Sequence, residues 1–138
     1  MNEGEISAGM AGTPSYRYAD RVGRRLYVSG QVPLDGSGEL VGTGDAAKQA
    51  TQCLNNLSLL LKHHDFGKED IRRLVVYVAG SRDEMTATWD RVVEWFGGAV
   101  PPATLLGVTL LGYEGQLVEI DANIDANSDL DDHAEPDK

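Results

Sequence analysis

The sequence predicts an α+β fold in which a single sheet carries two helices on one face. Two long segments place apolar residues at spacings of three and four, as amphipathic helices do, and five short segments have the alternation or the β-branched composition of strands. Along the chain these segments follow one another in the order ββαβαββ. A chain of 138 residues fits one domain, and helices packed on one side of a sheet would give that domain its core.

The first two strands are predicted as a hairpin within residues 15–30 that turns around Val22-Gly23. The segment that follows, "PLDGSGELVGTG", has the chemistry of turns, because Asp35-Gly36 and Gly38 favour positive φ. We expect this segment to protrude from the sheet as a loop or small ribbon.

The first helix is predicted from Gly44 to about His64, with Asp45 or Thr43 as its N-terminal cap. Cys53 lies on its apolar side, so we expect this residue to fill the core rather than to act as a reactive thiol. The apolar side consists of Ala46, Ala50, Cys53, Leu54, Leu57, Leu60 and Leu61.

The second half of the chain supplies three strands and a helix. The segment "IRRLVVYVAG" has apolar residues on both faces, which is typical of an interior strand. A capping box from Ser81 to Glu84 begins the second helix, and Trp89 lies on its apolar stripe. The strands "ATLLGVTLL" and "QLVEIDANI" complete the fold, joined by a turn at residues 112–115.

Two helices on one face leave the other face of the predicted sheet uncovered. Because the strands are apolar, that face would form a larger apolar patch than monomers usually expose. We therefore expect neighbouring subunits of a homo-oligomer to cover it. The hydrophilic stretches at residues 1–13 and 126–138, the second of them acidic, are predicted to be flexible.

Charge and composition exclude several classes of function. Lys and Arg number 12 against 22 Asp and Glu, for a net charge of −10, so the surface should repel nucleic acid. The chain has no run of about 18 apolar residues and no basic start followed by an apolar stretch. We therefore expect no membrane span, no targeting segment and a cytoplasmic location, and the single cysteine excludes an internal disulfide.

The residues predict no metal site and no phosphate-binding loop. His63 and His64 are adjacent, so we expect them to point to different sides of the helix as surface and cap residues, and His133 lies in the acidic tail. The glycines of "GSGELVGTG" do not follow a βαβ start, and no Lys-Ser/Thr pair closes the loop.

Glu119 is the most informative carboxylate. In "QLVEIDANI", alternation places Val118 and Ile120 on one face and Glu119 and Asp121 on the other. If the apolar set packs on the helices, Glu119 faces the surface where we expect a neighbouring subunit. A carboxylate there needs a hydrogen-bond donor or has a raised pKa. Two roles stay open for Glu119: it positions or deprotonates a water, or it accepts a hydrogen bond between subunits.

Taken together, "SYRYADRVGRRLYVSGQVP", "QATQCLNNLSLLLKHHDF", "IRRLVVYVAG", "PPATLLGV" and "LVEIDANI" resemble the Rid (reactive-intermediate deaminase, YjgF) family over a single domain at residues 14–125. The resemblance implies a chorismate-mutase-like fold and a homotrimer whose sheets form a central barrel, with small-molecule clefts between subunits. It also implies hydrolysis of 2-aminoacrylate and related enamines or imines to 2-oxo acids and ammonia, without a cofactor or metal.

The resemblance assigns catalytic roles to Tyr16 and Glu119 and a substrate contact to the backbone of Gly30. Deaminases of this family begin the corresponding strand with Pro-Ala-Arg-Ser, and the arginine grips the substrate carboxylate. Laid over this chain, the arginine falls on Ala103 and the serine on Thr104.

Two further substrate-binding positions also depart from the family pattern. A helix position where many active members have Asn corresponds to Trp89, and a small residue two after the arginine corresponds to Leu105. These replacements imply an apolar cleft and weak or absent activity on 2-aminoacrylate. Arg17 and Arg91 are the candidates to supply the missing charge.

Two functions therefore stay open. The first is an enzyme of altered specificity that hydrolyses or tautomerises an enamine, imine or related reactive carbonyl compound, with Glu119 and Tyr16 carrying the chemistry. The second is a non-catalytic trimer that binds a small apolar metabolite or a partner protein in the same clefts. A ribonuclease activity is disfavoured by the acidic charge and by the lack of a suitable pair of histidines.

Overall fold

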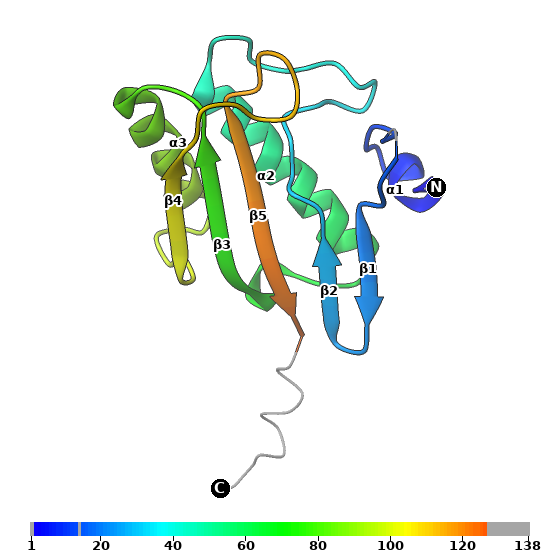
Figure 1. Ribbon diagram of the computed structural model, residues 1–138. Coiled ribbons are helices and arrows are strands. Elements are labelled where there is room, and N and C mark those ends of the chain that lie inside the picture. Colours follow the sequence, from blue (N-terminus) through cyan, green and yellow to red (C-terminus); the bar gives the residue numbers. More distant parts are fainter. Residues whose placement is uncertain (1, 14, 127–138) are drawn as a thin grey trace, which may run out of the picture.

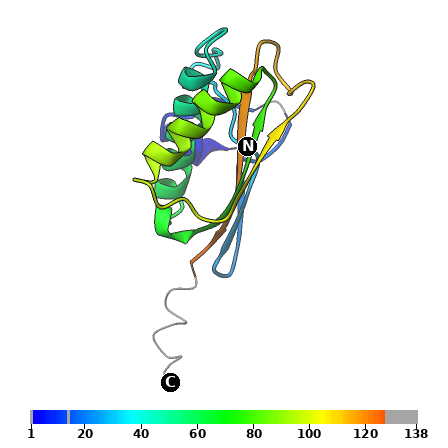
Figure 2. The ribbon, with the colours of Figure 1, turned by 90° about the vertical axis from the view of Figure 1, so that its left-hand side faces the viewer.

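The computed structural model describes residues 2–13 and 15–126, so all but the first residue of the predicted tail at 126–138 lies outside the described residues. Helices α2 and α3 lie side by side on one face of a five-stranded sheet, and the other face is uncovered (Figures 1 and 2). This confirms the predicted α+β architecture. Within the described residues, no helix is both long enough and apolar enough to cross a bilayer.

The predicted order ββαβαββ is confirmed, and a short helix precedes it. Strand β4 is shorter than the predicted "ATLLGVTLL", because pairing with its neighbour ends at Gly107. The elements are α1 (Glu3–Ser7), β1 (Ala19–Val22), β2 (Arg25–Val28), α2 (Ala46–His63), a 3-10 turn (Lys68–Asp70), β3 (Ile71–Val78), α3 (Arg82–Trp95), β4 (Ala103–Gly107) and β5 (Val118–Asp125).

The sheet has the strand order β1-β2-β5-β3-β4, so the last strand of the chain lies in the middle. Strand β3 pairs antiparallel with β5 and parallel with β4, which requires the crossover through α3. In the register, Glu119 lies opposite Tyr77, and Thr104 lies opposite Val75. Side chains at these four positions share one face of the sheet.

Both long helices begin at the caps that the sequence predicts. The Asp45 side chain accepts a hydrogen bond from the backbone N–H of Lys48 at the start of α2. At α3, Ser81 and Glu84 form the reciprocal capping box. These local bonds satisfy N–H groups that a helix leaves without partners and so fix where each helix starts.

The core lies between the sheet and the two long helices. Cys53 is fully buried there, as predicted, and Trp89 of α3 packs against the same core. Alternation along β3 and β5 puts buried residues toward the helices. The buried residues of these two strands are Ile71, Leu74, Val76, Val78, Val118, Ile120, Ala122 and Ile124.

The uncovered sheet face is more polar than the sequence analysis assumed. Arg73, Asp121 and Asn123 lie on it beside Val75 and Tyr77, and two of these five side chains are exposed. Burial of an apolar patch therefore does not by itself require a partner subunit on this face.

The segment at residues 2–13 packs against the body of the protein, although the sequence predicts a flexible end. Met10 is buried with Tyr18 and Leu60 in a small cluster of its own. The Asn2 side chain accepts a hydrogen bond from the Tyr18 N–H and donates one to the Tyr16 carbonyl. The hydrophilic composition of the segment hides these few long-range anchors.

Candidate active site

Three of the predicted site residues, Tyr16, Gly30 and Glu119, line one hollow of about 280 Å³. It lies where the chain leaves β2 and where the loop between β4 and β5 approaches the middle of the sheet. Its full lining is Tyr16, Ser29, Gly30, Val32, Gly112, Tyr113 and Glu119. The fold thus brings together side chains that are about 100 positions apart in the sequence.

The carboxylate of Glu119 is held by Gln116, a residue that the sequence analysis missed. The Gln116 side chain is buried, and its Nε2 donates to Glu119 Oε1 at 3.2 Å and to the Val118 carbonyl at 3.0 Å. Its oxygen accepts from the Tyr113 N–H at 3.0 Å. Gln116 therefore orients the Glu119 carboxylate and connects it to the loop between β4 and β5.

Gly30 lies directly against the Glu119 carboxylate. A Cβ atom at position 30 would clash with Oε2 and would also crowd the carbon atoms of that side chain. The absence of a side chain at Gly30 is what allows the backbone after β2 to approach the carboxylate so closely. This explains the glycine by the geometry of the site rather than by a turn.

Burial raises the pKa of the Glu119 carboxyl above its ordinary value, although the hydrogen bond from Gln116 acts in the opposite direction. The negative charge of Asp121 on the same face raises the pKa of Glu119 further. A carboxylate with a raised pKa is a stronger base than one in water, so it accepts a proton from a bound molecule more readily.

Tyr16 presents a neutral hydroxyl to the same hollow. Its hydroxyl lies 3.4 Å from that of Tyr113, and burial, together with this neighbour, raises the pKa of Tyr16 far above neutral pH. Tyr16 therefore stays protonated and can donate a hydrogen bond to a ligand. Tyr18 has its ring edge-on to Tyr16 and donates to the Ala11 carbonyl at 2.6 Å, and burial raises the pKa of Tyr18 to about 12.

Tyr113 was also missed by the sequence analysis, which treated residues 112–115 only as a turn. Its backbone is anchored by Gln116, and the loop is fastened to α2 by Gln49, which is fully buried and donates to the Gly115 carbonyl at 3.1 Å. A tyrosine between two glycines of a turn was the available signal. Only the fold brings it to Tyr16.

The other predicted substrate residues do not line this hollow. Trp89, Ala103 and Leu105 pack against the core on the helix side of the sheet. Thr104 has the opposite orientation and accepts a hydrogen bond from Arg73 at 2.7 Å on the uncovered face. The register therefore places the Thr104 side chain, and not that of Ala103, on the face of the sheet that carries Glu119.

The hollow has no cationic side chain among its described lining residues. Arg91 donates to Thr51 of α2 at 2.6 Å, which directs it to the contact between the two helices. Arg17 pairs with Asp20 at 3.5 Å on the surface. Neither of the arginines that the sequence offers as substitutes is therefore held at the hollow.

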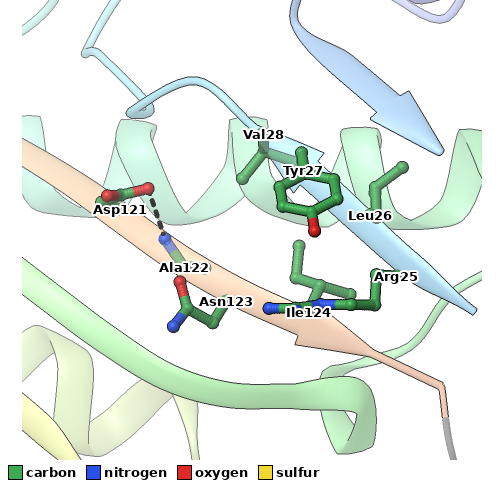
Figure 3. Close-up of a pocket in the computed structure, with 8 residues that line it drawn as sticks. All are labelled: Arg25, Leu26, Tyr27, Val28, Asp121, Ala122, Asn123 and Ile124. Atoms are coloured by element: carbon green, nitrogen blue, oxygen red, sulfur yellow. Dashed lines mark hydrogen bonds between the residues drawn. The ribbon is translucent and has the colours of Figure 1, made fainter. Parts of the chain in front are cut away.

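A second, smaller hollow of about 150 Å³ opens where β2 and β5 separate (Figure 3). The two strands pair at Leu26 and Ile124 and meet again only at the bridge between Gln31 and Ile120. The guanidinium of Arg25 lies over the Tyr27 ring in this gap, 5.1 Å from its centroid. Because the two strands are unpaired along this gap, the chain after β2 can bend toward Glu119.

Comparison with known proteins decides the family. The family model described as endoribonuclease L-PSP matches residues 8–125. The chain is 34% identical over 108 residues to mouse 2-iminobutanoate/2-iminopropanoate deaminase, covering 78% of each chain. The chain belongs to the Rid family. A RutC family protein of Pyrococcus horikoshii is 30% identical over 110 residues, covering 78% of this chain and 83% of the relative.

A solved structure supports the same assignment. A Rid-family protein from Yersinia pestis superposes with a TM-score of 0.76 and 26% identity, covering 84% of this chain and 91% of that chain. Membership of the Rid family agrees with the resemblance carried by the strand and helix motifs.

Proposed function

We propose that this Rid-family protein hydrolyses an enamine or imine metabolite to a carbonyl compound and ammonia without a cofactor. The observation that carries the proposal is the Glu119 carboxylate, whose pKa is raised by burial and which is held between Gly30 and Gln116 at a hollow shared with Tyr16. The name of the mouse relative, a 2-iminobutanoate/2-iminopropanoate deaminase, supports this class of substrate.

The proposed reaction assigns a separate task to each group. Glu119 takes a proton from a water, whose oxygen bonds to the carbon of the C=N group while the imine nitrogen takes up a proton. Protonated Glu119 then gives its proton to the amine nitrogen of the resulting carbinolamine, ammonia leaves as the C–N bond breaks, and the hydroxyl proton passes back to Glu119 as the C=O bond forms. The Tyr16 hydroxyl orients the substrate by donating a hydrogen bond. An enamine would first take a proton on carbon to become the imine.

We also propose that 2-aminoacrylate is a poor substrate. A lost charge-assisted hydrogen bond to a carboxylate costs about 1.5–3 kcal/mol, or about one to two powers of ten in rate. We propose Thr104 as the counterpart of the family arginine, because it shares the face of Glu119 and because Pro102-Ala103 then aligns with the Pro-Ala of the family pattern. Thr104 offers only a hydroxyl, which already accepts a hydrogen bond from Arg73. The proposed substrate is therefore an imine or enamine without an α-carboxylate.

A homotrimer with inter-subunit clefts would bring the two parts of the site together. Thr104 and Glu119 share the uncovered face, but β3 lies between their strands. Two strand spacings of about 4.8 Å and an offset of two residues along the strands separate them by about 12 Å within one chain. A neighbouring subunit could place its own Thr104 opposite Glu119. Sedimentation analysis tests this, and a stable monomer at assay concentration would contradict it.

The experiment compares ammonia release by the wild type, Glu119→Gln and Asp121→Asn. The substrates are 2-aminoacrylate and an imine that lacks the carboxylate. We expect faster turnover of the second substrate and a loss of about 10²-fold or more in Glu119→Gln. Asp121→Asn is the matched control, because burial also raises the pKa of Asp121 but this side chain does not line the hollow. Since its charge raises the pKa of Glu119, its removal should lower turnover only slightly.

The alternative function, a non-catalytic trimer that binds a small apolar metabolite or a partner protein, predicts a different result. Apolar ligands would then raise the melting temperature of the wild type and of Glu119→Gln equally, with no product formed by either. Efficient hydrolysis of 2-aminoacrylate by the wild type would contradict the proposed specificity but not the proposed chemistry.

A further inference from the structure

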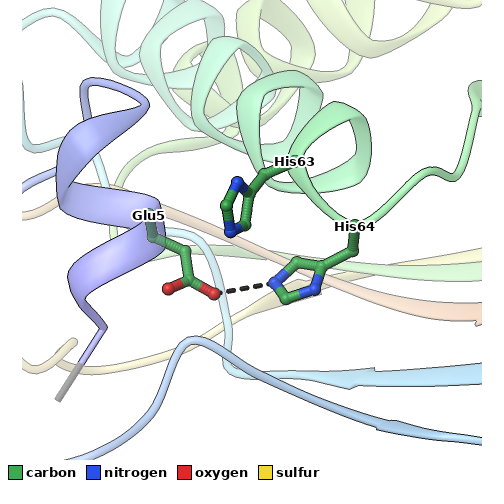
Figure 4. Close-up of side chains that lie close together, drawn as sticks. All are labelled: Glu5, His63 and His64. Atoms are coloured by element: carbon green, nitrogen blue, oxygen red, sulfur yellow. Dashed lines mark hydrogen bonds and ion pairs between the residues drawn. The ribbon is translucent and has the colours of Figure 1, made fainter.

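Away from the hollow, three potential metal ligands meet at the end of α2. Glu5 of α1 and the adjacent His63 and His64 each direct one donor atom to a common point, with all three atoms within 4.8 Å of one another (Figure 4). Among them, His64 Nε2 lies 2.7 Å from Glu5 Oε2. None of the three residues lines the hollow beside Glu119.

Adjacent histidines converge here because the helix ends between them. His63 is the last residue of α2, and His64 is its C-cap, with φ −100° and ψ 14°. The chain then turns through Asp65 at a positive φ of 64°. The two rings are 4.8 Å apart and nearly perpendicular. The expectation that the two side chains point to different sides of a helix is therefore wrong, although His64 is a cap residue as predicted.

The short helix α1 fits this pair of rings closely. A Cβ atom at Gly4 would collide with Nε2 and Cε1 of His63, so the missing side chain at position 4 leaves the space in which this ring lies. The next residue, Glu5, has a side chain only 9% exposed, whereas His63 is exposed to solvent. Gly4 thus leaves the space for the His63 ring, and Glu5 supplies a buried carboxylate as a second ligand.

We propose that Glu5, His63 and His64 form a binding site for Zn²⁺. Two imidazole nitrogens and one carboxylate oxygen are a ligand set that zinc accepts, with water as the fourth ligand on the exposed side. Bond lengths of about 2.05 Å in a tetrahedron place donor atoms about 3.3 Å apart. Zinc would therefore replace the hydrogen bond between His64 and Glu5, whose atoms must separate from 2.7 Å to this distance. A small rotation of the exposed His63 ring can adjust the third donor, which lies within 4.8 Å of the other two.

A bound ion would fasten α1 to α2 and, through α1, the segment that carries Tyr16. Asn2, next to α1, donates to the Tyr16 carbonyl at 3.0 Å and accepts from the Tyr18 N–H at 2.9 Å. The proposed site therefore acts on stability and on the anchoring of Tyr16. It does not take part in the hydrolysis proposed above and does not depend on that proposal.

The test is calorimetric titration of the full chain with ZnCl₂ after treatment with a chelator. We expect one Zn²⁺ per chain and a rise in melting temperature on binding. His63→Gln, His64→Gln and Glu5→Gln should each weaken the affinity at least about tenfold. His63→Gln is the most secure variant, because this side chain is exposed and its replacement should not disturb folding.

Two further variants decide between this site and other sources of zinc binding. Gly4→Ala keeps all three ligands but fills the space of the His63 ring, so it should weaken zinc binding as well. His133→Gln removes the one histidine outside the cluster and should leave the affinity unchanged. The proposal is overturned if the wild type binds no zinc, if His63→Gln binds zinc as tightly as the wild type, or if His133→Gln alone abolishes binding.

Discussion

The uncovered face of the sheet has a β5 side and a β4 side, which present different chemical groups to a ligand. On the β5 side, Glu119 lies against Gly30, accepts a hydrogen bond from Gln116 and shares a hollow with the neutral hydroxyl of Tyr16. On the β4 side, Thr104 bonds to Arg73 on the same face, while Ala103 packs into the core behind it. The first side is built around a half-buried carboxylate, and on the second the cation beside Thr104, Arg73, comes from the neighbouring strand β3.

This difference suggests that proton transfer and substrate selection are separable in this protein. In the proposed reaction, the groups on the β5 side activate a water whatever the rest of the substrate is, because they act on the reacting atoms alone. Recognition of a carboxylate is strongest with a planar cationic donor, whereas β4 provides a hydroxyl, and the guanidinium beside it, that of Arg73 of β3, is bonded to this hydroxyl. Substitutions on the β5 side should therefore abolish turnover, and substitutions on the β4 side should change which compound is turned over.

After the loss expected from Glu119→Gln, the largest effect is expected from Gly30→Ala. The added methyl group would collide with the Glu119 carboxylate and displace it, and a misplacement of about 1 Å can cost about 10²-fold in rate. Turnover of the carboxylate-free imine should fall by this order while the circular dichroism spectrum stays that of the wild type. Gly23→Ala is a suitable control, because a Cβ atom built at Gly23 meets no other atom. This substitution strains only the backbone of its own turn, where φ is positive. Normal turnover by folded Gly30→Ala would show that the close approach is not needed.

A gain of function should follow from Thr104→Arg. An arginine on the uncovered face should raise kcat/KM for 2-aminoacrylate by about one to two powers of ten, the value of a charge-assisted bond to the carboxylate. Ala103→Arg adds the same side chain one residue earlier, where the strand points to the core, so it should give no gain and should lower stability. If Ala103→Arg gains activity and Thr104→Arg does not, the alignment that puts the family arginine at Ala103 is correct.

The smallest effect concerns stability and pH. Because burial raises the pKa of Glu119 in the folded state, the folded protein binds more protons than the unfolded chain between the unfolded and folded pKa values. The contribution of Glu119 to the free energy of unfolding therefore decreases as the pH rises through this window, which begins at about pH 4.3. The stability that is lost in the window is still missing at neutral pH. Glu119→Gln cannot lose a proton and escapes this loss.

Urea unfolding of the wild type and Glu119→Gln at several pH values measures this effect. The stability of the variant relative to the wild type should increase from acid to neutral pH. Asp121→Asn should show a change of the same sign, because burial also raises the pKa of Asp121. A stability difference between Glu119→Gln and the wild type that is constant across this range would contradict a raised pKa at Glu119.

Local patterns predicted most of the fold because each depends on neighbours in the sequence. The Asp45 cap, the capping box of Ser81 and Glu84, and the alternation that turns Glu119 away from the helices are all present in the structure. Each is a bond or a periodicity within a few residues, so the chain specifies it before any distant segment is in place. The family motifs added the grouping of Tyr16, Gly30 and Glu119.

The remaining features depend on chain segments that meet only in the folded protein. Gln116 and Tyr113 act at the hollow because buried Gln49 of α2 fastens their loop, and no local pattern encodes that contact. The exact strand register, which decides whether Ala103 or Thr104 shares the uncovered face with Glu119, follows from pairing with β3.

The sequence by itself determined the order of the elements, the helix starts and the presence of a carboxylate on the uncovered face. Only the tertiary structure decided which groups surround that carboxylate and that Glu5 meets His63 and His64. The physical reason is that hydrogen bonds within a helix turn and side-chain alternation are fixed over a few residues. Contacts between α1 and the end of α2, or between a loop and Glu119, depend on the packing of the whole core.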